Sequence, residues 1–488
     1  MFEFTKYLPD AASTDSLAQS LAPYLMPGDV LALTGHLGAG KSHFARALII
    51  ALGSQQKHLP SPTFTLMQNY DDTRIPVAHV DFYRLGDPSE ADELALDPFI
   101  NHGLALIEWA DNAPHVCPER TLRVEIEDKD SDTQNGRQIT FKSADESWGK
   151  RFGFFMPELQ RPVTEKGRSQ FVQNVTGKKG QVISAVSADA SFRSYWRVRD
   201  GETSYVLMDA PPPMEDLAPF VKMANYLEGI GIYAPHIYHQ DADKGYLLLE
   251  DFGNKTVLDA IQDGADALPL YESAVDVLVK IAQSNPASVP RQASAQWQDE
   301  ACLFTDWFLP VSTGHATHTA DRRMFRSLIS GLINAMPKLP ETTMLKDYHC
   351  QNLMVIEGRE EEESLGVLDF QDARRGTVAY DMASLLYDVR HRVPGHFHAI
   401  LLQRFADSYG QGLDVDELAK GVRLIATENL LRIAGVFTRL AHRDGKTQYL
   451  DYVPLIWQYL DKLLAEEPEA AELANFIYKR TPNAQVAV

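Results

Sequence analysis

The eight residues from Gly35 to Ser42, with the sequence GHLGAGKS, constrain the fold of this chain more than any other segment. They match the pattern G-x-x-x-x-G-K-S, which joins a buried strand to a helix and binds phosphate. Both neighbours are predicted, because residues 29–34 are a short apolar run and residues 43–52 read as a helix that ends at a glycine. The pattern therefore predicts an α/β domain with a phosphate-binding loop.

The residues of this loop are predicted to bind the phosphates of ATP and a magnesium ion. Glycines let the backbone N–H groups turn toward phosphate, and the N-terminus of the following helix adds a partial positive charge. Lys41 is expected to reach the terminal phosphates, and the Ser42 hydroxyl is expected to ligate Mg²⁺. The predicted cofactor-binding residues of the loop are Gly35, Gly38, Gly40, Lys41 and Ser42.

Three further polar residues are candidates for the same site. Thr63 lies on the proline-stiffened segment Ser-Pro-Thr-Phe, which suits a sensor of the terminal phosphate or its magnesium. Asp81 and Glu108 come at the ends of two apolar strand candidates, residues 77–80 and 104–107. Ligands of α/β sheets bind at the carboxyl ends of strands, so Asp81 is predicted to be a metal contact. For either acid taken singly, a surface or capping carboxylate is the alternative.

The chain divides into two predicted domains. Its 488 residues favour two to four domains. Residues 1–145 alternate strand and helix, which indicates an α/β P-loop domain with an antiparallel edge. Residues 146–164 are irregular and are interpreted as a linker. Residues 165–488 read as a β-rich lobe followed by a mostly helical lobe, which predicts an α+β bilobal, kinase-like domain.

A second catalytic pattern lies in the helical lobe. Asp347 and Asn352 have the D-x-x-x-x-N spacing of kinase catalytic loops. A carboxylate at the first position accepts the proton of the substrate hydroxyl, and an amide at the last holds magnesium. Asp369 follows an apolar strand candidate at hairpin distance and supplies a second metal acid. Structural acids in a helical domain are the alternative interpretation.

The charge balance argues against autonomous binding of nucleic acid. There are 46 Lys and Arg residues against 67 Asp and Glu residues, a formal net charge of −21. Proteins that bind nucleic acid on their own usually carry a basic patch that neutralises phosphates. The sequence shows no membrane-length apolar run, no signal-peptide pattern, and no disulfide or zinc spacing among its three cysteines. We expect a cytosolic, reduced protein.

Residues 1–142 resemble the TsaE family of ATPases, which act in bacterial tRNA threonylcarbamoyladenosine synthesis. The segments GHLGAGKS, SPTF, HVDFYRL and IEWAD occur in the family's order. The resemblance implies that Lys41 and Ser42 bind phosphate and magnesium and that Thr63 belongs to a switch segment. It also implies that Asp81 is the magnesium-side acid and that Glu108 is needed for hydrolysis or its coupling. Family members act with TsaD and TsaB, which handle the tRNA.

Residues 165–460 resemble the aminoglycoside-phosphotransferase superfamily, on the segments LKDYHCQNLMV, GVLDFQDA and AYDMASLL. Within it, SADASFRSYWRV and YVLMDAPP are most similar to kinases of N-acetylmuramate or N-acetylglucosamine that act at the anomeric hydroxyl. The resemblance implies Asp347 as the base, with Asn352 and Asp369 as magnesium ligands, and Asp381 as a brace for the loop. It also implies an adenine-binding connector whose residues include Glu250 and Asp251.

This part of the chain departs from the superfamily pattern in its phosphate-binding residues. Leu345 replaces a histidine two residues before the base, and no G-x-G-x-x-G precedes the second strand. The strand that normally carries the phosphate-binding lysine reads Val-Leu-Met at residues 206–208. Three cations are candidates to replace it, without ranking: Arg193, Arg197 and Lys222.

The favoured hypothesis is a bifunctional protein that uses ATP and Mg²⁺ in both halves. The first half would be an ATPase subunit for tRNA modification, and the second would phosphorylate a small hydroxylated substrate. Two alternatives stay open. The first half could be a nucleotide-gated binding module that docks on TsaD and TsaB. The second half could phosphorylate another small molecule, or serve as a non-catalytic scaffold because its lysine is absent.

Overall fold

The structure is a computed structural model. It describes residues 2–54, 56, 59–62, 65–128, 136–145, 147–155, 165–177, 182–188, 193–201, 203–212, 215–315, 317–356 and 365–481. The chain forms two compact units. The first comprises Met1–Gln160 with Leu309–Met324, and the second comprises Arg161–Phe308 with Phe325–Val488. Among the described residues, no helix is both long and apolar enough to cross a membrane.

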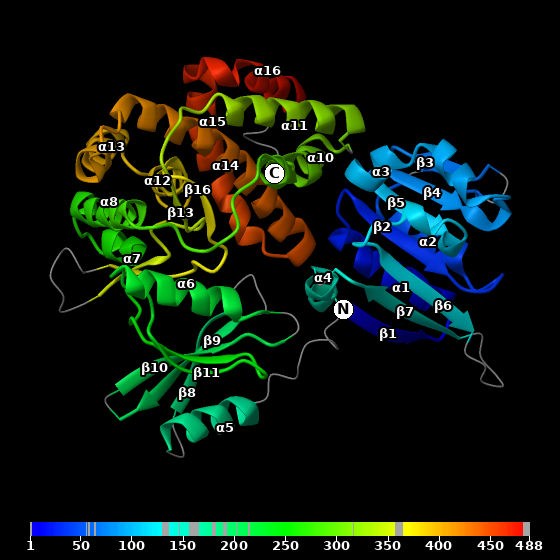
Figure 1. The fold of residues 1–488 in the computed structure, drawn as a ribbon, viewed down its shortest axis with the longest axis horizontal. Helices are drawn as coiled ribbons and strands as arrows, with labels where there is room; N and C mark the ends of the chain where they lie inside the picture. Colours follow the sequence, from blue (N-terminus) through cyan, green and yellow to red (C-terminus); the bar gives the residue numbers. More distant parts are fainter. Residues whose placement is uncertain are drawn as a thin grey trace. The chain divides into compact units, whose positions relative to one another are not determined.

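The first unit is built on a seven-stranded mixed sheet with the order β1-β7-β6-β2-β5-β4-β3 (Figure 1). Strand β2 is parallel to β5 and β6, and β5 is parallel to β4, whereas the edges pair antiparallel. The buried central strands are almost wholly apolar, as expected of parallel strands covered on both faces. The strands are β1 (Phe2–Leu8), β2 (Asp29–Thr34), β3 (Met67–Tyr70), β4 (Val77–Asp81), β5 (Leu104–Glu108), β6 (Leu122–Asp128) and β7 (Arg137–Ser143).

Two separate apolar clusters cover the faces of this sheet. On one face, helices α1 (Ala11–Leu21) and α2 (Lys41–Ala51) pack against the sheet through residues such as Leu21, Phe44 and Leu48. The other face contributes Val30 and Val80 to a smaller cluster, against which residues of α3 (Asp97–His102) pack. Helix α2 therefore begins directly at the end of the central strand β2, with the phosphate-binding loop between them.

Residues 147–155, which the sequence analysis assigns to the linker, form helix α4 (Ser147–Phe155) on the first unit. Trp148 and Phe152 lie one turn apart, and both are fully buried. The Phe152 ring lies 4.7 Å from the rings of Phe2 and Phe141, and the Trp148 indole donates to the carbonyl of Arg120 at 2.9 Å. Burial of two aromatic side chains stabilises this short helix, although its two glycines disfavour it locally.

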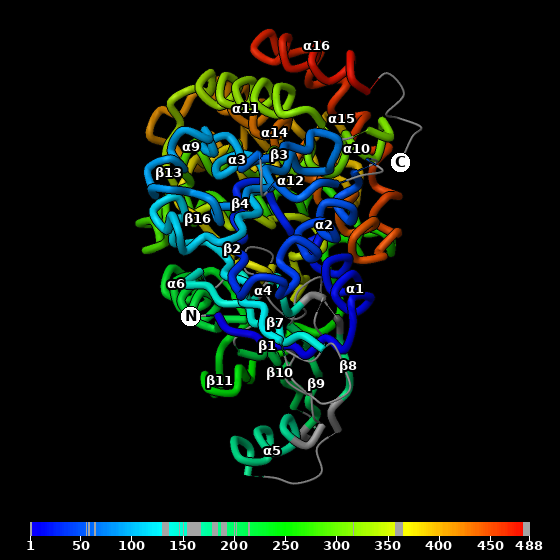
Figure 2. Tube along the Cα trace, turned by 90° about the vertical axis from the view of Figure 1, so that its right-hand side faces the viewer, coloured from blue at the N-terminus to red at the C-terminus, as the bar shows by residue number. Residues whose placement is uncertain are grey.

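The second unit contains a five-stranded antiparallel sheet in the order β11-β12-β10-β9-β8. Helix α5 (Glu165–Thr176) packs on one side of it through Phe171 and Val172. Helix α6 (Ala218–Gly229) lies on the opposite side from α5, between the sheet and the helical part of the unit (Figures 1 and 2). The strands are β8 (Val182–Ala188), β9 (Ser194–Asp200), β10 (Thr203–Asp209), β11 (Ile237–Asp241) and β12 (Tyr246–Glu250).

The helical part of the chain carries two small antiparallel sheets of two strands each. Strand β13 (Glu341–Met344) pairs with β16 (Arg374–Thr377), and β14 (Leu353–Val355) pairs with β15 (Leu365–Val367). The helices are α7 (Val257–Gln262), α8 (Ala267–Gln283), α9 (Ser294–Ala301), α10 (Leu309–Thr313), α11 (Thr319–Asn334), α12 (Ala379–Leu386), α13 (Gly395–Tyr409), α14 (Val415–Asp444), α15 (Val453–Glu466) and α16 (Ala471–Arg480). The predicted order of a P-loop α/β fold followed by a bilobal kinase-like fold is confirmed.

Candidate active sites

The phosphate-binding loop has the backbone geometry that its glycines allow. Gly35 has φ +139°, and a Cβ at this position would lie 2.3 Å from the carbonyl oxygen of Ile126. Gly40, the residue before helix α2, has φ +109°, and within the described part of the chain nothing lies within 4 Å of a Cβ built on it or on Gly38. Gly35 is therefore required by its neighbours, whereas the space beside Gly38 and Gly40 suits a close approach of phosphate.

Lys41 is held inside this loop. Its Nζ donates to the carbonyl oxygens of Gly35 and His36 at 2.8 and 2.9 Å and lies 3.9 Å from the centre of the Trp109 ring. Burial lowers the pKa of Lys41, while the charges of Glu108 and Asp81 oppose that shift. The ammonium group is thus placed at the loop by two carbonyls and one aromatic face.

The two strand-end acids lie side by side in the first unit. Strands β4 and β5 are parallel and place Asp81 opposite Glu108, and Glu108 in turn lies opposite Leu33 of β2. Both carboxyl groups are buried, and the Ser42 hydroxyl donates to Glu108 Oε2 at 2.8 Å. Asp81 Oδ1 accepts from the backbone N–H of Tyr83 at 2.9 Å. Oxygen donors of this type suit Mg²⁺, and the residues present fit such an ion.

His79 is a member of this site that the sequence analysis did not propose. It is fully buried on β4, and its Nε2 lies 2.8 Å from Glu108 Oε1. The other oxygen of the same carboxylate accepts from Ser42, so Glu108 is held from both sides. The sequence feature that could have identified His79 is its position within the otherwise apolar strand candidate of residues 77–80. Thr63, the predicted switch residue, lies outside the described residues.

We expect His79→Gln to lower ATP hydrolysis by the first unit about tenfold, the size of effect seen when a residue that orients a reacting group is changed. The change replaces the ring that holds Glu108, whereas the loop and Lys41 stay in place. ATP affinity should therefore change less than twofold. Binding and steady-state hydrolysis of ATP should be measured on the same preparation, with His115→Gln, an exposed histidine of the same unit, as the control. An equal loss of binding and hydrolysis would contradict the orienting role.

The second candidate site is built around the loop between β13 and β14. The carboxylate of Asp381, at the start of α12, accepts from the backbone N–H groups of Leu345 and Lys346 at 2.7 and 3.0 Å. Lys346 has φ +77°, a left-handed conformation that is unfavourable for a side chain other than glycine. Its ammonium lies 2.7 Å from Glu300. These contacts fix the backbone on which Asp347 follows, in agreement with a bracing role for Asp381.

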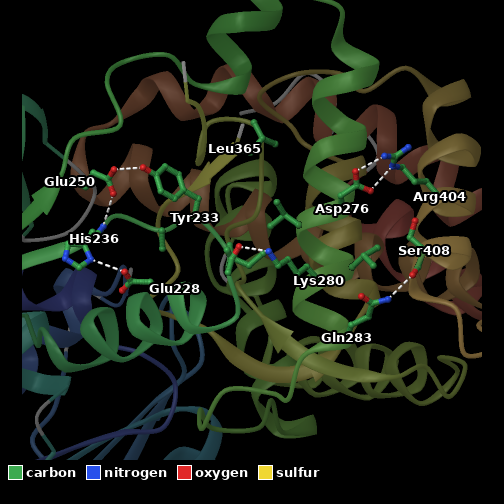
Figure 3. Close-up of a pocket in the computed structure, with 15 residues that line it drawn as sticks. Glu228, Tyr233, His236, Glu250, Asp276, Lys280, Gln283, Leu365, Arg404 and Ser408 are labelled. Atoms are coloured by element: carbon green, nitrogen blue, oxygen red, sulfur yellow. Dashed lines mark hydrogen bonds and ion pairs between the residues drawn. The ribbon is translucent and has the colours of Figure 1, made fainter. Parts of the chain in front are cut away.

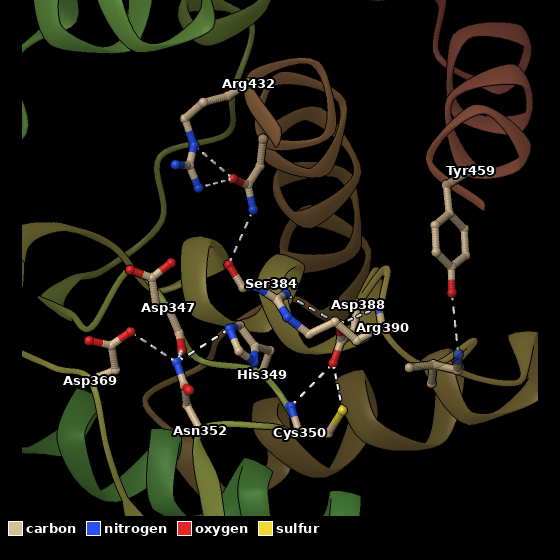
Figure 4. Close-up of polar contacts among 12 residues, drawn as sticks. Asp347, His349, Cys350, Asn352, Asp369, Ser384, Asp388, Arg390, Arg432 and Tyr459 are labelled. Atoms are coloured by element: carbon tan, nitrogen blue, oxygen red, sulfur yellow. Dashed lines mark hydrogen bonds and ion pairs between the residues drawn. The ribbon is translucent and has the colours of Figure 1, made fainter. Parts of the chain in front are cut away.

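The predicted metal ligands meet at Asn352 (Figure 4). Its Nδ2 donates to the main-chain oxygen of Asp347 at 2.9 Å and lies 3.4 Å from Asp369 Oδ2. Gln371 donates to the other oxygen of Asp369 at 2.7 Å. The structure therefore brings Asp369, which follows β15, to the loop that contains Asp347 and Asn352. One amide and one carboxylate fit Mg²⁺, which keeps water and phosphate oxygens as its other ligands.

Two arginines face the catalytic-loop aspartate, and neither was proposed from the sequence. Burial raises the pKa of Asp347, while the positive charges of Arg432 and Arg390 oppose the rise. Both guanidinium groups are held in place. Arg432 donates to Asn429 Oδ1 at 2.7 and 3.1 Å, and Arg390 lies 3.6 Å from Asp388 (Figure 4). Together with Asp347, these four residues line a small cavity of about 80 Å³, which has room for a reacting hydroxyl.

Two buried ionisable groups next to this loop are kept uncharged. Burial lowers the pKa of His349 to about 3, and its Nε2 lies 3.3 Å from Asn352 Nδ2. Burial raises the pKa of Glu428 to about 8, although Arg432 opposes the rise. Among the described residues, neither Glu428 oxygen has a hydrogen-bond partner. Both groups are therefore neutral near pH 7.

We expect Glu428→Gln to remove a pH dependence of folding stability. The folded protein holds a proton on Glu428 up to about pH 8, whereas the unfolded chain releases it near the ordinary glutamate value of 4.5. Protonated Glu428 therefore contributes to the free energy of unfolding of the wild type fully below pH 4.5, and this contribution is lost as pH rises toward 8. The melting temperatures of wild type and variant should be measured from pH 5 to 9. They should be similar at acidic pH, and that of the variant should be higher at pH 8.5. Glu417→Gln, an exposed position of the same helix, is the control. A variant with the wild-type slope would contradict the assignment.

On the predicted adenine connector, the side chains of Glu250 and Asp251 accept hydrogen bonds from neighbouring residues of the protein. Glu250 accepts from the Tyr233 hydroxyl and from the backbone N–H of His236. It lines a cavity of about 820 Å³ together with residues of α8 and α13 (Figure 3). Asp251 accepts from Arg197 Nε at 2.6 Å and from the Ser204 hydroxyl at 2.5 Å.

Comparisons with known proteins assign both parts of the chain. The family model "Threonylcarbamoyl adenosine biosynthesis protein TsaE" matches residues 8–139, and the model "Phosphotransferase enzyme family" matches residues 182–417. The N-acetylmuramate/N-acetylglucosamine kinase of Pseudomonas aeruginosa is 36% identical over 297 residues, which cover 60% of this chain and 86% of that protein. The TsaE protein of Bacillus subtilis is 36% identical over 149 residues, which cover 30% of this chain and 88% of that protein.

The fold, the two sites and these matches define an enzyme that joins a P-loop ATPase to a phosphotransferase. The chain belongs to the TsaE family through its first part and to the N-acetylmuramate/N-acetylglucosamine kinase family through its second part. The resemblances stated from the sequence are thereby confirmed.

Proposed function

We propose that the second part of the chain, residues 165–488, transfers the γ-phosphoryl group of ATP to the anomeric hydroxyl of N-acetylmuramate or N-acetylglucosamine. The observation that carries this proposal is the meeting of Asp369 with the loop of Asp347 and Asn352, beside a cavity with two guanidinium groups. The relatives' names support the choice of amino sugar. Arg390 and Arg432 supply donors for the polar groups of such an acceptor.

The reaction would use Asp347 as the base. Its raised pKa brings it closer to the operating pH, which favours proton transfer from the attacking hydroxyl. Asn352 and Asp369 would hold Mg²⁺, which on binding neutralises charge on the phosphates. Asp381 and Lys346 keep the loop in place, so that the base and the metal ligands stay in register during transfer.

We further propose that the first part, residues 1–145, is the ATPase subunit for tRNA threonylcarbamoyladenosine modification and acts with TsaD and TsaB. Glu108 would be the residue required for hydrolysis, because it is held between Ser42 and His79 at the phosphate-binding loop. The net charge of −21 supports a role in which partners rather than this chain contact the tRNA.

We expect Asp347→Asn and Asp369→Asn to fail in different ways. Asparagine cannot take the hydroxyl proton, so Asp347→Asn should lower sugar phosphorylation about 10²–10⁴-fold and leave Mg-ATP affinity nearly unchanged. Asp369→Asn should weaken Mg-ATP binding, because it removes a carboxylate from the metal. Turnover should be measured with both amino sugars and with 1-deoxy analogues, and the anomer of the product determined. Asp263→Asn, at an exposed position, is the matched control.

Equal loss of Mg-ATP affinity in the two variants would mean that the base and the metal ligand are wrongly assigned. Full turnover of Asp347→Asn would remove the central residue of the kinase proposal. Phosphorylation of the 1-deoxy sugars would move the acceptor to another hydroxyl.

We expect Lys41→Ala to abolish ATP turnover that depends on TsaD and TsaB, while phosphorylation of sugar proceeds at the wild-type rate. The lysine belongs to the loop of the first unit, whereas the catalytic loop with Asp347 belongs to the second. Both activities should be assayed on the full chain, with and without the partner proteins. Loss of both activities in a folded variant would contradict two independent sites, and ATPase activity unaffected by the partners would contradict the proposed assembly.

A further inference from the structure

The kinase part of the chain has no cation on the strand where kinases usually place their phosphate-binding lysine. Strand β10 reads TSYVLMD and contains neither lysine nor arginine. In protein kinases that lysine is held by a carboxylate from the following helix, and the pair binds phosphate of ATP. Three candidates lie on or next to β9 and α6, namely Arg193, Arg197 and Lys222, whereas Arg199 of β9 is exposed.

Two of these cations are poor candidates for binding phosphate, because of where their side chains lie. Arg197 is committed to the connector: its guanidinium donates to both carboxylate oxygens of Asp251, to the Asn254 side chain and to the carbonyl of Gly253. Lys222 is exposed on α6. Neither arrangement directs a buried positive charge to the metal-binding acid.

Arg193 forms a buried ion pair of the required kind. Its Nε and Nη2 donate to Glu215 Oε2 at 3.2 and 3.0 Å, and the two side chains are only 11% and 8% exposed. Arg193 comes directly before β9, whose first residue pairs with Asp209, the last residue of β10. Glu215 lies between β10 and α6. The pair therefore joins the start of β9 to the segment before α6, next to the strand and the helix that carry the lysine and the glutamate in protein kinases.

Helix α6 connects this ion pair to the metal-binding acid. The Phe220 ring of α6 packs on Phe370 with 4.9 Å between ring centres, and Phe370 directly follows Asp369. Burial opposes the charge of Arg193, yet Glu215 and Asp372, which follows Asp369 by three residues, help to raise its pKa. Two observations thus put Arg193 on the side of the fold that carries the metal-binding acid.

We propose that Arg193, oriented by Glu215, is the cation that binds the phosphates of ATP in the kinase site and replaces the absent lysine of β10. A guanidinium is a planar fork with five N–H donors, a geometry that matches the oxygens of both a carboxylate and a phosphate. The inference rests on the proposed kinase function. It also gives the kinase part a phosphate ligand, which removes the reason to regard that part as a scaffold.

The test is the dependence of affinity on the number of phosphates. Binding of adenosine, AMP, ADP and a non-hydrolysable ATP analogue with Mg²⁺ should be measured by calorimetry on full-length proteins. Every protein carries Lys41→Ala, so that the phosphate-binding loop of the first unit does not contribute. Arg193→Met should weaken binding of ADP and the ATP analogue about tenfold to hundredfold, the range for losing a hydrogen bond to a charged group. Adenosine should bind within twofold of the parent protein.

Two further variants keep the test valid if Arg193→Met does not fold. Arg193→Lys retains the charge and should lose less affinity for the ATP analogue than Arg193→Met. Glu215→Gln leaves the cation but removes the charge of its partner, and should weaken binding of the ATP analogue while adenosine affinity is unchanged. Lys222→Met removes one positive charge from the exposed side of α6, and should keep ATP affinity within twofold.

Equal weakening of adenosine and ATP analogue in the Arg193 variants would show a purely structural ion pair and overturn the proposal. Affinity for the ATP analogue within twofold of the parent would overturn it as well. The binding series needs no sugar. A protein that binds ATP through Arg193 but phosphorylates no amino sugar would therefore refute the proposed substrate and leave this inference standing.

Discussion

The kinase site depends on two hydrogen bonds, which the backbone N–H groups of Leu345 and Lys346 donate to Asp381. They fix the one turn of chain that precedes Asp347, including a lysine in a left-handed conformation. Such a conformation costs about 1–3 kcal/mol for a residue with a side chain, and it persists only where the surroundings determine it. Asp381 meets the backbone from one side, and Glu300 meets the Lys346 ammonium from the other. The position of Asp347 thus depends on contacts made by the two residues before it.

In the phosphate-binding loop of the first unit, the constraint is the burial of charged groups. A buried charge is tolerated only where opposite charges or hydrogen bonds replace water. Lys41 is met by two carbonyls and an aromatic ring, and Glu108 is met by Ser42 and His79. Each site therefore includes groups that hold a buried charge in place, such as His79 beside Glu108 and Glu300 beside Lys346.

Much of the fold and the central residues of both sites could be predicted from the sequence, because they lie in short continuous patterns. The loop from Gly35 to Ser42 and the loop from Asp347 to Asn352 each carry their chemistry within eight residues. The partners could not be predicted in this way. Arg432 lies 85 positions after Asp347, and only folding of α14 against the loop brings the two together.

Helix α4 shows a related limit. Two glycines and a short length weaken the helical signal in the sequence of α4. The helix is stabilised instead by its buried aromatic residues, such as Phe152, which contacts Phe2 more than a hundred residues earlier in the chain. The ion pair of Arg193 with Glu215 likewise joins segments that no spacing rule connects. Tertiary packing therefore determined these features.

The hydrogen bond from Ser42 to Glu108 has a consequence for communication within the ATPase site. A hydroxyl group has one proton and two lone pairs, so Ser42 is able to ligate a cation while it still donates to Glu108. A cation on the oxygen draws electrons from the O–H bond and makes that proton a stronger donor. Through this shared proton, the carboxylate of Glu108 would be sensitive to a cation bound at Ser42. Serine and threonine side chains can provide both functions, so a hydroxyl at this position would link a bound metal ion to the acid through one hydrogen bond.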